Sequence, residues 1–308
     1  DDPEMMDVID QVFATVSTGP VGEGMSRFVE WLLNHAQPIF LVIDSAINGL
    51  AGAIEQILSV PAPWLLAPLI AILAAWRVSF SFAILSLLGL NLVLFMGLWP
   101  PMISTLALVI AASLLALIIG IPIGIFSARR QHIWAITRPV LDLMQTMPAF
   151  VYLIPAVMFF GTGLVPSTIA TLIFSMPPVV RLTYLGIRQV PVDLIEAGRA
   201  FGCSERQLLW KVQLPNALPT LMAGVNQTIM LALSMVVIAS MIGGGGLGDV
   251  VLRGIQQLDV GLGFEGGLAV VILAVILDRL TQSLTASNFS RKSLPQRFKA
   301  FINLWTSS

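Results

Sequence analysis

The sequence predicts an all-α integral membrane protein with about seven transmembrane helices, because it has few charges, long apolar segments and an uneven distribution of basic residues. Charged residues make up 11% of the 308 residues and hydrophobic residues 56%, and the mean hydropathy is +0.89. A soluble domain has about 25% charged residues. A chain of this composition cannot cover itself with a polar surface, so we expect it to lie in a lipid bilayer.

Residues 1–60 are expected to form an external region that contains an amphipathic helix. Between Ile39 and Leu58 the apolar residues recur at helical spacing, but Asp44, Asn48 and Glu55 interrupt the apolar run. This pattern favours a helix that lies in the membrane interface. A helix packed on the outer rim of the bundle is the alternative.

Residues 61–284 contain seven segments that each approach the roughly 20 apolar residues needed to cross the hydrocarbon core. The predicted spans are 64–78, 80–99, 102–127, 139–161, 166–187, 217–242 and 266–284. Pro148 and Pro155 are expected to break the fourth span, because proline removes a backbone hydrogen bond inside a helix. The glycines from Gly243 to Gly246 predict a tight turn where helices approach closely.

The basic residues orient the predicted spans. When successive loops are placed on alternate sides of the membrane, all of the 16 Lys and Arg residues except Arg27 and Arg253 fall on one side. Because cytoplasmic loops carry an excess of Lys and Arg, that side is predicted to be the cytoplasm. The N-terminus is then periplasmic, and the C-terminal tail, residues 285–308, is cytoplasmic.

No residue pattern in the chain indicates catalysis, a metal site or an ATP site. The topology places the two histidines, His35 and His132, on opposite sides of the membrane, and the single Cys203 has no histidine near it in sequence. The glycine run is followed by Asp249, whereas a phosphate-binding loop needs a Lys after its last glycine. We therefore expect this chain to have no catalytic residue, no metal ligand and no bound cofactor.

Uncharged polar, aromatic and methionine side chains inside the fourth and sixth predicted spans are candidates for a translocation path. They are Gln145, Thr146, Met147, Tyr152, Asn226, Gln227 and Met230. Such polar groups often serve only as hydrogen bonds between helices, so packing is the alternative. No Asp or Glu lies near the centre of a predicted span, which disfavours a proton-driven or sodium-driven carrier.

The stretch from residue 196 to residue 215 is longer and more polar than a loop between two spans needs to be. It combines several charged residues with an apolar stripe at Ala200, Leu208, Leu209 and Val212. This pattern predicts an amphipathic helix outside the bilayer, within residues 192–215. We expect the face of that helix to dock another protein.

The spacing of residues in this stretch resembles a cytoplasmic pattern of the permease subunits of ABC importers. Glu196-Ala197-Gly198 is followed by Gly202, then by Val212 and Leu214-Pro215. Gly198 replaces the second alanine of that pattern, and Val212 replaces its usual isoleucine. Five further stretches resemble the glycine betaine/proline betaine permeases, namely 141–155, 181–191, 219–242, 251–262 and 271–282.

The resemblance implies the MetI-like transmembrane fold of a type I ABC importer in a bacterial inner membrane. The implied function is import of glycine betaine, proline betaine and similar osmolytes for osmoprotection. The implied partners are a second copy of the chain, an ATPase dimer that binds the ATP and magnesium, a periplasmic substrate-binding protein and lipid, with no nucleic acid. The alternatives are an ABC permease for choline, carnitine or another small amine, and an ATP-independent channel or carrier.

In that setting a set of motif residues would couple ATP hydrolysis in the partner to transport. They are Glu196, Ala197, Gly198, Gly202, Val212, Leu214 and Pro215. Gly198 and Gly202 are expected to let the helix approach a neighbour closely, and Gly202 is also expected to open a turn. Pro215 is expected to stop the segment and to set the angle of the next span.

Overall fold

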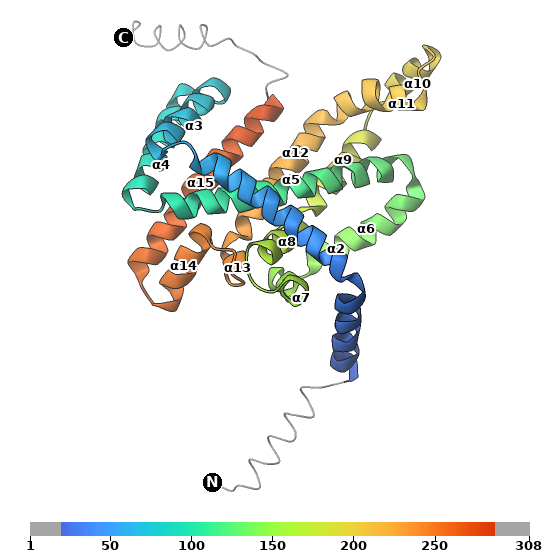
Figure 1. Cartoon of the computed structure of the whole chain (residues 1–308). Coiled ribbons are helices and arrows are strands. Elements are labelled where there is room, and N and C mark those ends of the chain that lie inside the picture. The colour runs from blue at the N-terminus through green and yellow to red at the C-terminus, as the bar shows by residue number, and fades with distance from the viewer. Residues whose placement is uncertain (1–19, 287–308) are drawn as a thin grey trace, which may run out of the picture.

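Helices and short connections make up the described part of the chain, residues 20–286, in this computed structural model (Figure 1). The helices are α2 (Pro20–Ser59), α3 (Pro63–Arg77), α4 (Phe80–Phe95), α5 (Trp99–Arg129), α6 (Gln131–Thr146), η1 (Ala149–Tyr152), α7 (Leu153–Phe160), α8 (Leu164–Ser175), α9 (Pro177–Arg188), α10 (Val192–Ala200), α11 (Glu205–Leu208), η2 (Leu209–Gln213), α12 (Leu214–Ser234), α13 (Val236–Ser240), α14 (Gly246–Gln256) and α15 (Val260–Ala286). The all-α prediction is confirmed over these residues. Residues 1–19 and most of the predicted C-terminal tail lie outside them.

The N-terminal helix α2 is longer than the sequence pattern predicted. It runs for 40 residues, and its part His35–Ser59 is long and apolar enough to cross a membrane. This part packs along α5, with further contacts to α7 and α8, and the hydroxyl of Ser104 on α5 donates a hydrogen bond to the Glu55 carboxylate. These contacts fit the alternative of a helix on the rim of the bundle.

The prediction of about seven spans is too high. Within residues 20–286, five helices are long and apolar enough to cross a membrane, or six if one bent pair counts as a span. Two predicted spans are lost at α3 and α4, which have 15 and 16 residues and so fall short of the roughly 20 that a span needs, and one that was not predicted is gained at His35–Ser59 of α2. The helices α3 and α4 form a hairpin whose second helix is capped by Ser79, with the Ser79 hydroxyl accepting from the Phe82 N–H.

The two prolines expected to break the fourth span behave differently. At Met147 and Pro148 the chain bends by 112° between α6 and the following η1 and α7, so the break at Pro148 is confirmed. Pro155 lies in the first turn of α7, where its missing N–H removes no hydrogen bond of the helix. The predicted break at Pro155 is therefore wrong.

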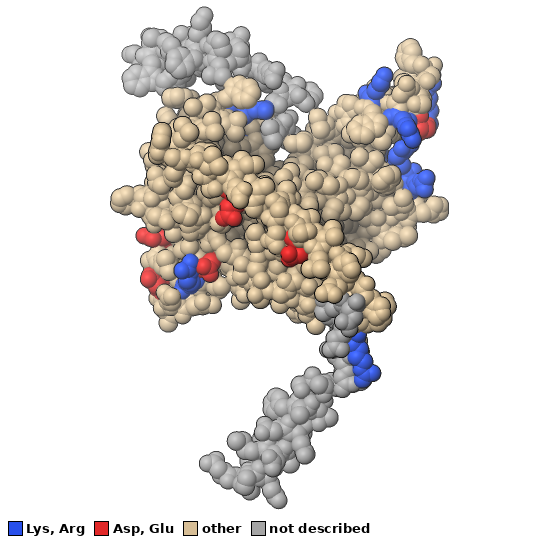
Figure 2. Space-filling model, viewed as in Figure 1, with Lys and Arg blue, Asp and Glu red and all other residues tan. Residues whose placement is uncertain are grey.

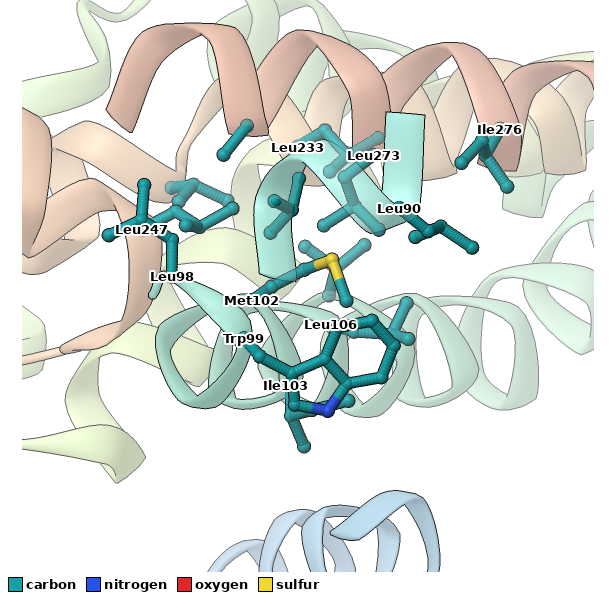
Figure 3. Packing of buried hydrophobic residues seen from close by; sticks show 14 of the residues in the cluster. Leu90, Leu98, Trp99, Met102, Ile103, Leu106, Leu233, Leu247, Leu273 and Ile276 are labelled. Atoms are coloured by element: carbon teal, nitrogen blue, oxygen red, sulfur yellow. The ribbon is translucent and has the colours of Figure 1, made fainter. Parts of the chain in front are cut away.

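The main apolar core lies where α5 meets α4, α12, α14 and α15 (Figure 3). Met102 of α5 and Leu247 of α14 are almost fully buried there, as is Leu90 of α4. On the other side of α5, Gly124 brings α9 close: a Cβ atom at Gly124 would lie 2.6 Å from Cβ of Thr183. Small residues permit such contacts between membrane helices, and they fix α9 and the chain that follows it.

The glycine run forms the predicted tight turn. Gly243, Gly245 and Gly246 all have positive φ, and a Cβ atom at Gly246 would lie 2.3 Å from the Thr105 hydroxyl. The sequence pattern did not predict the short helix α14 that follows. Its Leu247 and Val250 are buried, while Asp249 and Arg253 form an ion pair of 2.7 Å on the opposite face.

Candidate functional site: the segment between α9 and α12

The segment formed by α10, α11 and η2 projects from one end of the bundle, between α9 and α12 (Figure 1). Lys and Arg side chains gather over this end of the molecule (Figure 2). Gly224 brings α9 and α12 together, since a Cβ atom at Gly224 would lie 3.1 Å from Cα of Val179. The projecting segment is therefore joined at both ends to a tightly packed helix pair.

The segment consists of two helical parts, not the single helix predicted from the sequence. Gly202, with φ +78°, separates them. The N–H of Gly202 donates to the Arg199 carbonyl at 2.9 Å, and the N–H of Cys203 donates to the Gly198 carbonyl at 3.0 Å. This pair of bonds is a Schellman motif, in which a glycine ends a helix in the left-handed conformation. The turn expected at Gly202 is confirmed.

Ser204 starts the second part with a capping box. Its hydroxyl accepts from the Gln207 N–H at 3.4 Å, and the Gln207 side chain accepts from the Ser204 N–H at 2.8 Å. Arg199 and Glu205 form an exposed ion pair of 3.3 Å across the turn. The Ser-x-x-Gln spacing is a sequence signature of a helix N-terminus, and the start of α11 could have been predicted from it.

Gly198 lets the two parts pack together. A Cβ atom there would lie 2.8 Å from Cδ1 of Leu208 and 3.5 Å from Cγ2 of Val212. The close approach expected at Gly198 is confirmed, whereas Gly202 has open space around it. Gly202 is thus needed for its backbone conformation only.

The predicted apolar stripe mostly faces inward, so the stripe itself does not form an exposed surface. Leu208 and Leu209 are buried, and Leu209 packs with Ile187 of α9 and Ala217 of α12. The outward surface carries two aromatic residues instead: Phe201 is 89% exposed and Trp210 is 64% exposed. The helical spacing of these apolar residues was visible in the sequence, but the direction in which their side chains face depends on the turn at Gly202.

Pro215 does not stop the segment. The helix continues from Glu205 to Ser234, and the five residues before Leu214 form a π-helix in which the Leu214 N–H donates to the Leu209 carbonyl. A π-turn adds one residue to the ring that each hydrogen bond closes. The irregularity falls next to Pro215, which has no N–H to donate, and the chain enters α12 without a break.

The remaining motif residues differ in exposure. Glu196 and Ala197 are exposed on α10 and remain open to a partner, while Val212 and Leu214 are half-buried. A cavity of about 270 Å³ lies at the base of the segment. It is lined by Ala128, Arg129, Ile187, Arg188, Ile195, Glu205 and Gln213. No group of three or more His, Cys, Asp or Glu residues that could hold a metal occurs within the described residues.

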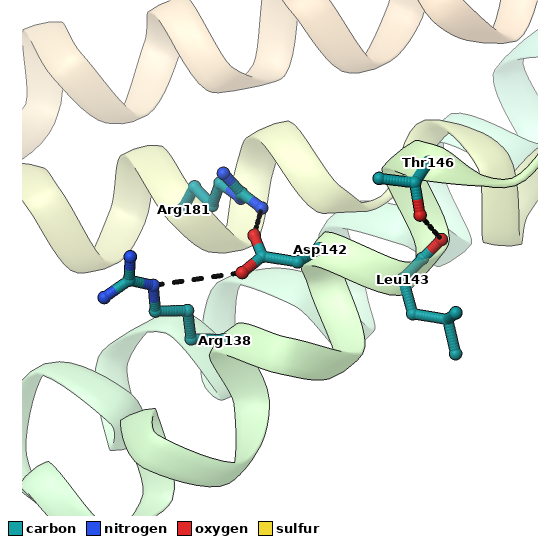
Figure 4. Close-up of polar contacts among 5 residues, drawn as sticks. All are labelled: Arg138, Asp142, Leu143, Thr146 and Arg181. Carbon is teal, nitrogen blue, oxygen red and sulfur yellow. Dashed lines mark hydrogen bonds and ion pairs between the residues drawn. The ribbon is translucent and has the colours of Figure 1, made fainter.

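The translocation candidates fall into two sets on different helices. Gln145 and Thr146 are the last two residues of α6 and Met147 follows them, and the Thr146 hydroxyl donates to the Leu143 carbonyl at 3.0 Å (Figure 4). Tyr152 is buried in η1, and its hydroxyl donates to the Met144 carbonyl. These four residues surround the bend between α6 and α7.

The second set lies on α12. The Asn226 amide donates to the Asp278 carboxylate on α15 at 3.1 Å, and it accepts from the Thr281 hydroxyl. Met230 packs against the main core, while Gln227 is exposed. Asp278 was missed from the sequence: it lies in the second half of α15, and no local pattern marks it as the partner of Asn226.

A further polar cluster joins α6 to α9. The Asp142 carboxylate pairs with Arg181 of α9 and, at 3.9 Å, with Arg138 of its own helix (Figure 4). The same two helices also share an aromatic contact, in which Trp134 of α6 stacks on Tyr184 of α9. These contacts were also missed, because the partners are about 40 to 50 positions apart in the sequence.

Apolar helices long enough to span a bilayer and a projecting segment between two of them define the described part of this chain as a membrane-embedded helical protein. The family described as binding-protein-dependent transport system inner membrane component matches residues 120–287, which is more than half of the chain. The chain belongs to this family. It is a permease subunit of an ABC transporter and is not itself the ATPase.

Two relatives are similar over most of the chain. The "Glycine betaine/proline betaine transport system permease protein ProW" of Escherichia coli (strain K12) is 50% identical over 274 residues, covering 88% of this chain and 77% of the relative. The "Glycine betaine/carnitine transport permease protein GbuB" of Listeria monocytogenes is 48% identical over 272 residues, covering 87% of this chain and 96% of the relative.

One solved structure shows the fold. It is an inward-facing methionine ABC transporter, MetNI, with a TM-score of 0.56 and 20% sequence identity, and the match covers 60% of this chain and 92% of that chain. This structural similarity confirms the predicted MetI-like fold of a type I importer.

Proposed function

We propose that this permease imports glycine betaine, proline betaine and related quaternary ammonium osmolytes, driven by ATP hydrolysis in a partner. The observation that carries the substrate class is the 50% identity to a permease named for those two betaines, over nearly the whole chain. The biological role would be osmoprotection in a bacterial inner membrane.

The projecting segment is proposed as the docking point for the ATPase dimer. The exposed rings of Phe201 and Trp210 are the kind of aromatic anchor that fills a pocket on a partner, and exposed Glu196 adds a charge beside them. The Schellman turn and capping box hold these residues in one arrangement, so a movement of the partner would reach α9 and α12 without being absorbed by a loose loop. ATP and magnesium would bind the ATPase and not this chain.

The proposed orientation puts the projecting segment and residues 285–308 in the cytoplasm, with the N-terminus in the periplasm. The gathering of Lys and Arg over α10 and α11 (Figure 2) supports this, because cytoplasmic loops are enriched in these residues. Residues 61–284 would then form the permease domain, with a second copy of the chain, lipid and an external substrate-binding protein as its other partners. We propose no contact with nucleic acid.

A second candidate substrate is carnitine, because a relative of 48% identity is named for both glycine betaine and carnitine. Choline and other small amines share the quaternary or tertiary ammonium group, and so they belong in the same test. A channel or carrier independent of ATP would not need the rigid projecting segment.

The test is reconstitution of the co-purified complex in liposomes. We expect an ATPase and a substrate-binding protein to co-purify with the chain, and glycine betaine or proline betaine to stimulate ATP hydrolysis and uptake together. Uptake that continues without the ATPase would overturn the ATP-driven function. Stimulation by carnitine or choline alone would overturn the substrate assignment.

A further inference from the structure

A cavity of about 490 Å³ lies between the C-terminal end of α2 and the start of α5. Sites for small molecules have volumes of about 300–1,000 Å³, so this cavity has room for a small ligand. Its walls include Glu55 of α2, Pro61 and Pro63 beside the start of α3, and Trp99, Pro100 and Ser104 of α5. None of the residues of the segment between α9 and α12 lines it.

Glu55 gives the cavity a negative charge that has no positive partner. Its side chain is half-buried, and the Ser104 hydroxyl donates a hydrogen bond to its carboxylate. Among the described residues, no Lys or Arg lines the cavity and none forms an ion pair with Glu55. Figure 2 shows the acidic side chains over α2 among uncharged residues. Removing a carboxylate from water without a positive partner costs free energy, and a cation in the cavity would offset that cost.

Trp99 gives the cavity a hydrogen-bond donor. The ring is buried between the main apolar core and the cavity, and Figure 3 shows the indole nitrogen on the side of the ring that faces α2. Within residues 20–286 this N–H donates to no partner, and Trp99 Nε1 is not among the polar atoms that are sealed from solvent. A buried tryptophan N–H usually has a partner. An acceptor group on a ligand would supply one here.

The wall between these two polar groups is apolar and stiff. Pro61, Pro63 and Pro100 contribute rings with fixed φ and have no backbone N–H. This wall therefore offers no donor of its own and loses little conformational freedom when a ligand binds. Alkyl groups on an ammonium nitrogen would pack against it without leaving an N–H unpaired.

The cavity lies near the boundary between the hydrocarbon core and the lipid headgroups. The 31 residues of α5 span about 46 Å at about 1.5 Å each, whereas the hydrocarbon core is about 30 Å thick. With α5 crossing the bilayer, its first two turns, which contain Trp99 and Ser104, fall near one membrane surface. A ligand can reach that depth from the water or from the headgroups.

We infer that the cavity between α2 and α5 binds a small zwitterion, with an alkylated ammonium group beside Glu55 and an anionic group beside the Trp99 N–H. Free betaine has this chemistry, and so does the headgroup of phosphatidylcholine. The inference rests on the cavity itself and not on the proposed function. A zwitterion bound there would connect α2 to α5 at the end of α5 that lies away from α10 and α11.

The test measures ligand binding to the purified permease and its ATPase, without a binding protein, in nanodiscs of phosphatidylglycerol, which has no ammonium group. Radiolabelled glycine betaine and tetramethylammonium are the probes, in equilibrium dialysis. Glu55→Gln should weaken the binding of both about tenfold, because the charge that attracts the ammonium group is lost. The glutamine oxygen can still accept from Ser104, so the variant is expected to fold.

Three further variants make the test specific. Trp99→Phe should weaken the binding of glycine betaine but not of tetramethylammonium, which has no anionic group. Glu55→Asp keeps the charge and should retain most of the binding of both probes. Asp44→Asn removes another carboxylate of α2, one that accepts from Asn48, and should have no effect. Wild-type binding by Glu55→Gln, or an equal loss in Asp44→Asn, would overturn the inference.

A lipid arm identifies the source of the ligand. Phosphatidylcholine is added to the nanodiscs, and the lipids that stay with the protein are identified by native mass spectrometry. Retention of phosphatidylcholine by the wild type but not by Glu55→Gln, with loss of glycine betaine binding, supports a headgroup as the occupant. Unchanged glycine betaine binding that depends on Glu55 supports a free zwitterion. If neither ligand depends on Glu55, the cavity is not a zwitterion site.

Discussion

Trp134 of α6 stacks on Tyr184 of α9 with ring centroids 3.7 Å apart and an angle of 6° between the rings. One turn along α9, Arg181 pairs with Asp142 of α6. Leu141, the one buried residue of α6, packs with Val179 and Val180 of α9, so polar, aromatic and apolar contacts all join α6 to α9. The position of α6, and of the bend that follows it, therefore depends on α9.

Exchange of the charges in the Asp142–Arg181 pair should test this dependence. We expect Asp142→Arg and Arg181→Asp alone each to lower betaine uptake per ATP hydrolysed several-fold, and the double variant to restore most of it. Thermal stability should change little, because a pair this exposed contributes about 0.2–1 kcal/mol. Uptake and hydrolysis are measured in parallel in liposomes, and equal uptake by the wild type and both single variants would contradict the dependence.

Substitutions at Gly198 should show how large a side chain the contact between α10 and α11 can accommodate. Gly198→Ala should be tolerated, because the nearest atom is the end of the flexible Leu208 side chain. Gly198→Leu should push α10 away from α11 at a cost of about 1–3 kcal/mol and reduce coupling. Adding Leu208→Ala to Gly198→Leu should recover part of the ATPase binding, measured by co-purification; no recovery would mean that the contact between these two positions is unimportant.

Gly202 should respond to backbone conformation and not to side-chain size. Gly202→Asn, which tolerates positive φ, should keep most of the coupling, whereas Gly202→Val should lose it, since the left-handed conformation costs an L-residue about 1–2 kcal/mol. Normal transport by Gly202→Val at wild-type expression would exclude a role for the turn.

Phe201→Ser should weaken ATPase binding without loss of stability, because the ring is exposed. As the matched core variant, Leu209→Ala should lower thermal stability, with a cost of about 2–5 kcal/mol for a buried leucine. Both effects are measured on the purified complex, by the ATPase recovered per permease and by thermal unfolding. If Phe201→Ser recovers as much ATPase as the wild type, this ring is not an anchor.

Cysteine labelling should fix the orientation. An impermeant thiol reagent should leave native Cys203 unlabelled in intact cells and reach it after permeabilisation. Phe264→Cys in a Cys203→Ser background should show the opposite behaviour. The reverse pattern at both positions would invert the proposed topology.

Local and global features of this fold were predictable to different degrees. Apolar composition predicted a helical membrane protein. Pro148 predicted the break and Gly202 predicted the turn, because each of these two features depends on a few neighbouring residues. The number of spans was overestimated, since hydropathy cannot tell a short helix such as α4 from a full span. The stripe at Leu208 and Leu209 was recognised, but its direction depends on packing against Ile187 and Ala217. Contacts such as Asn226–Asp278 join positions with no common local signal.

The unbroken helix from Glu205 to Ser234 gives the chain a stiff rod through the bundle. Thirty residues at about 1.5 Å each span about 45 Å, and beyond Ser234 the chain continues through α13 and the glycine turn into α14. A rod transmits displacement in both directions, and coupling free energies between two sites are reciprocal. If docking of a binding protein raises the affinity of the permease for the ATP-bound ATPase by some factor, ATP binding must therefore raise the affinity of the permease for the binding protein by the same factor.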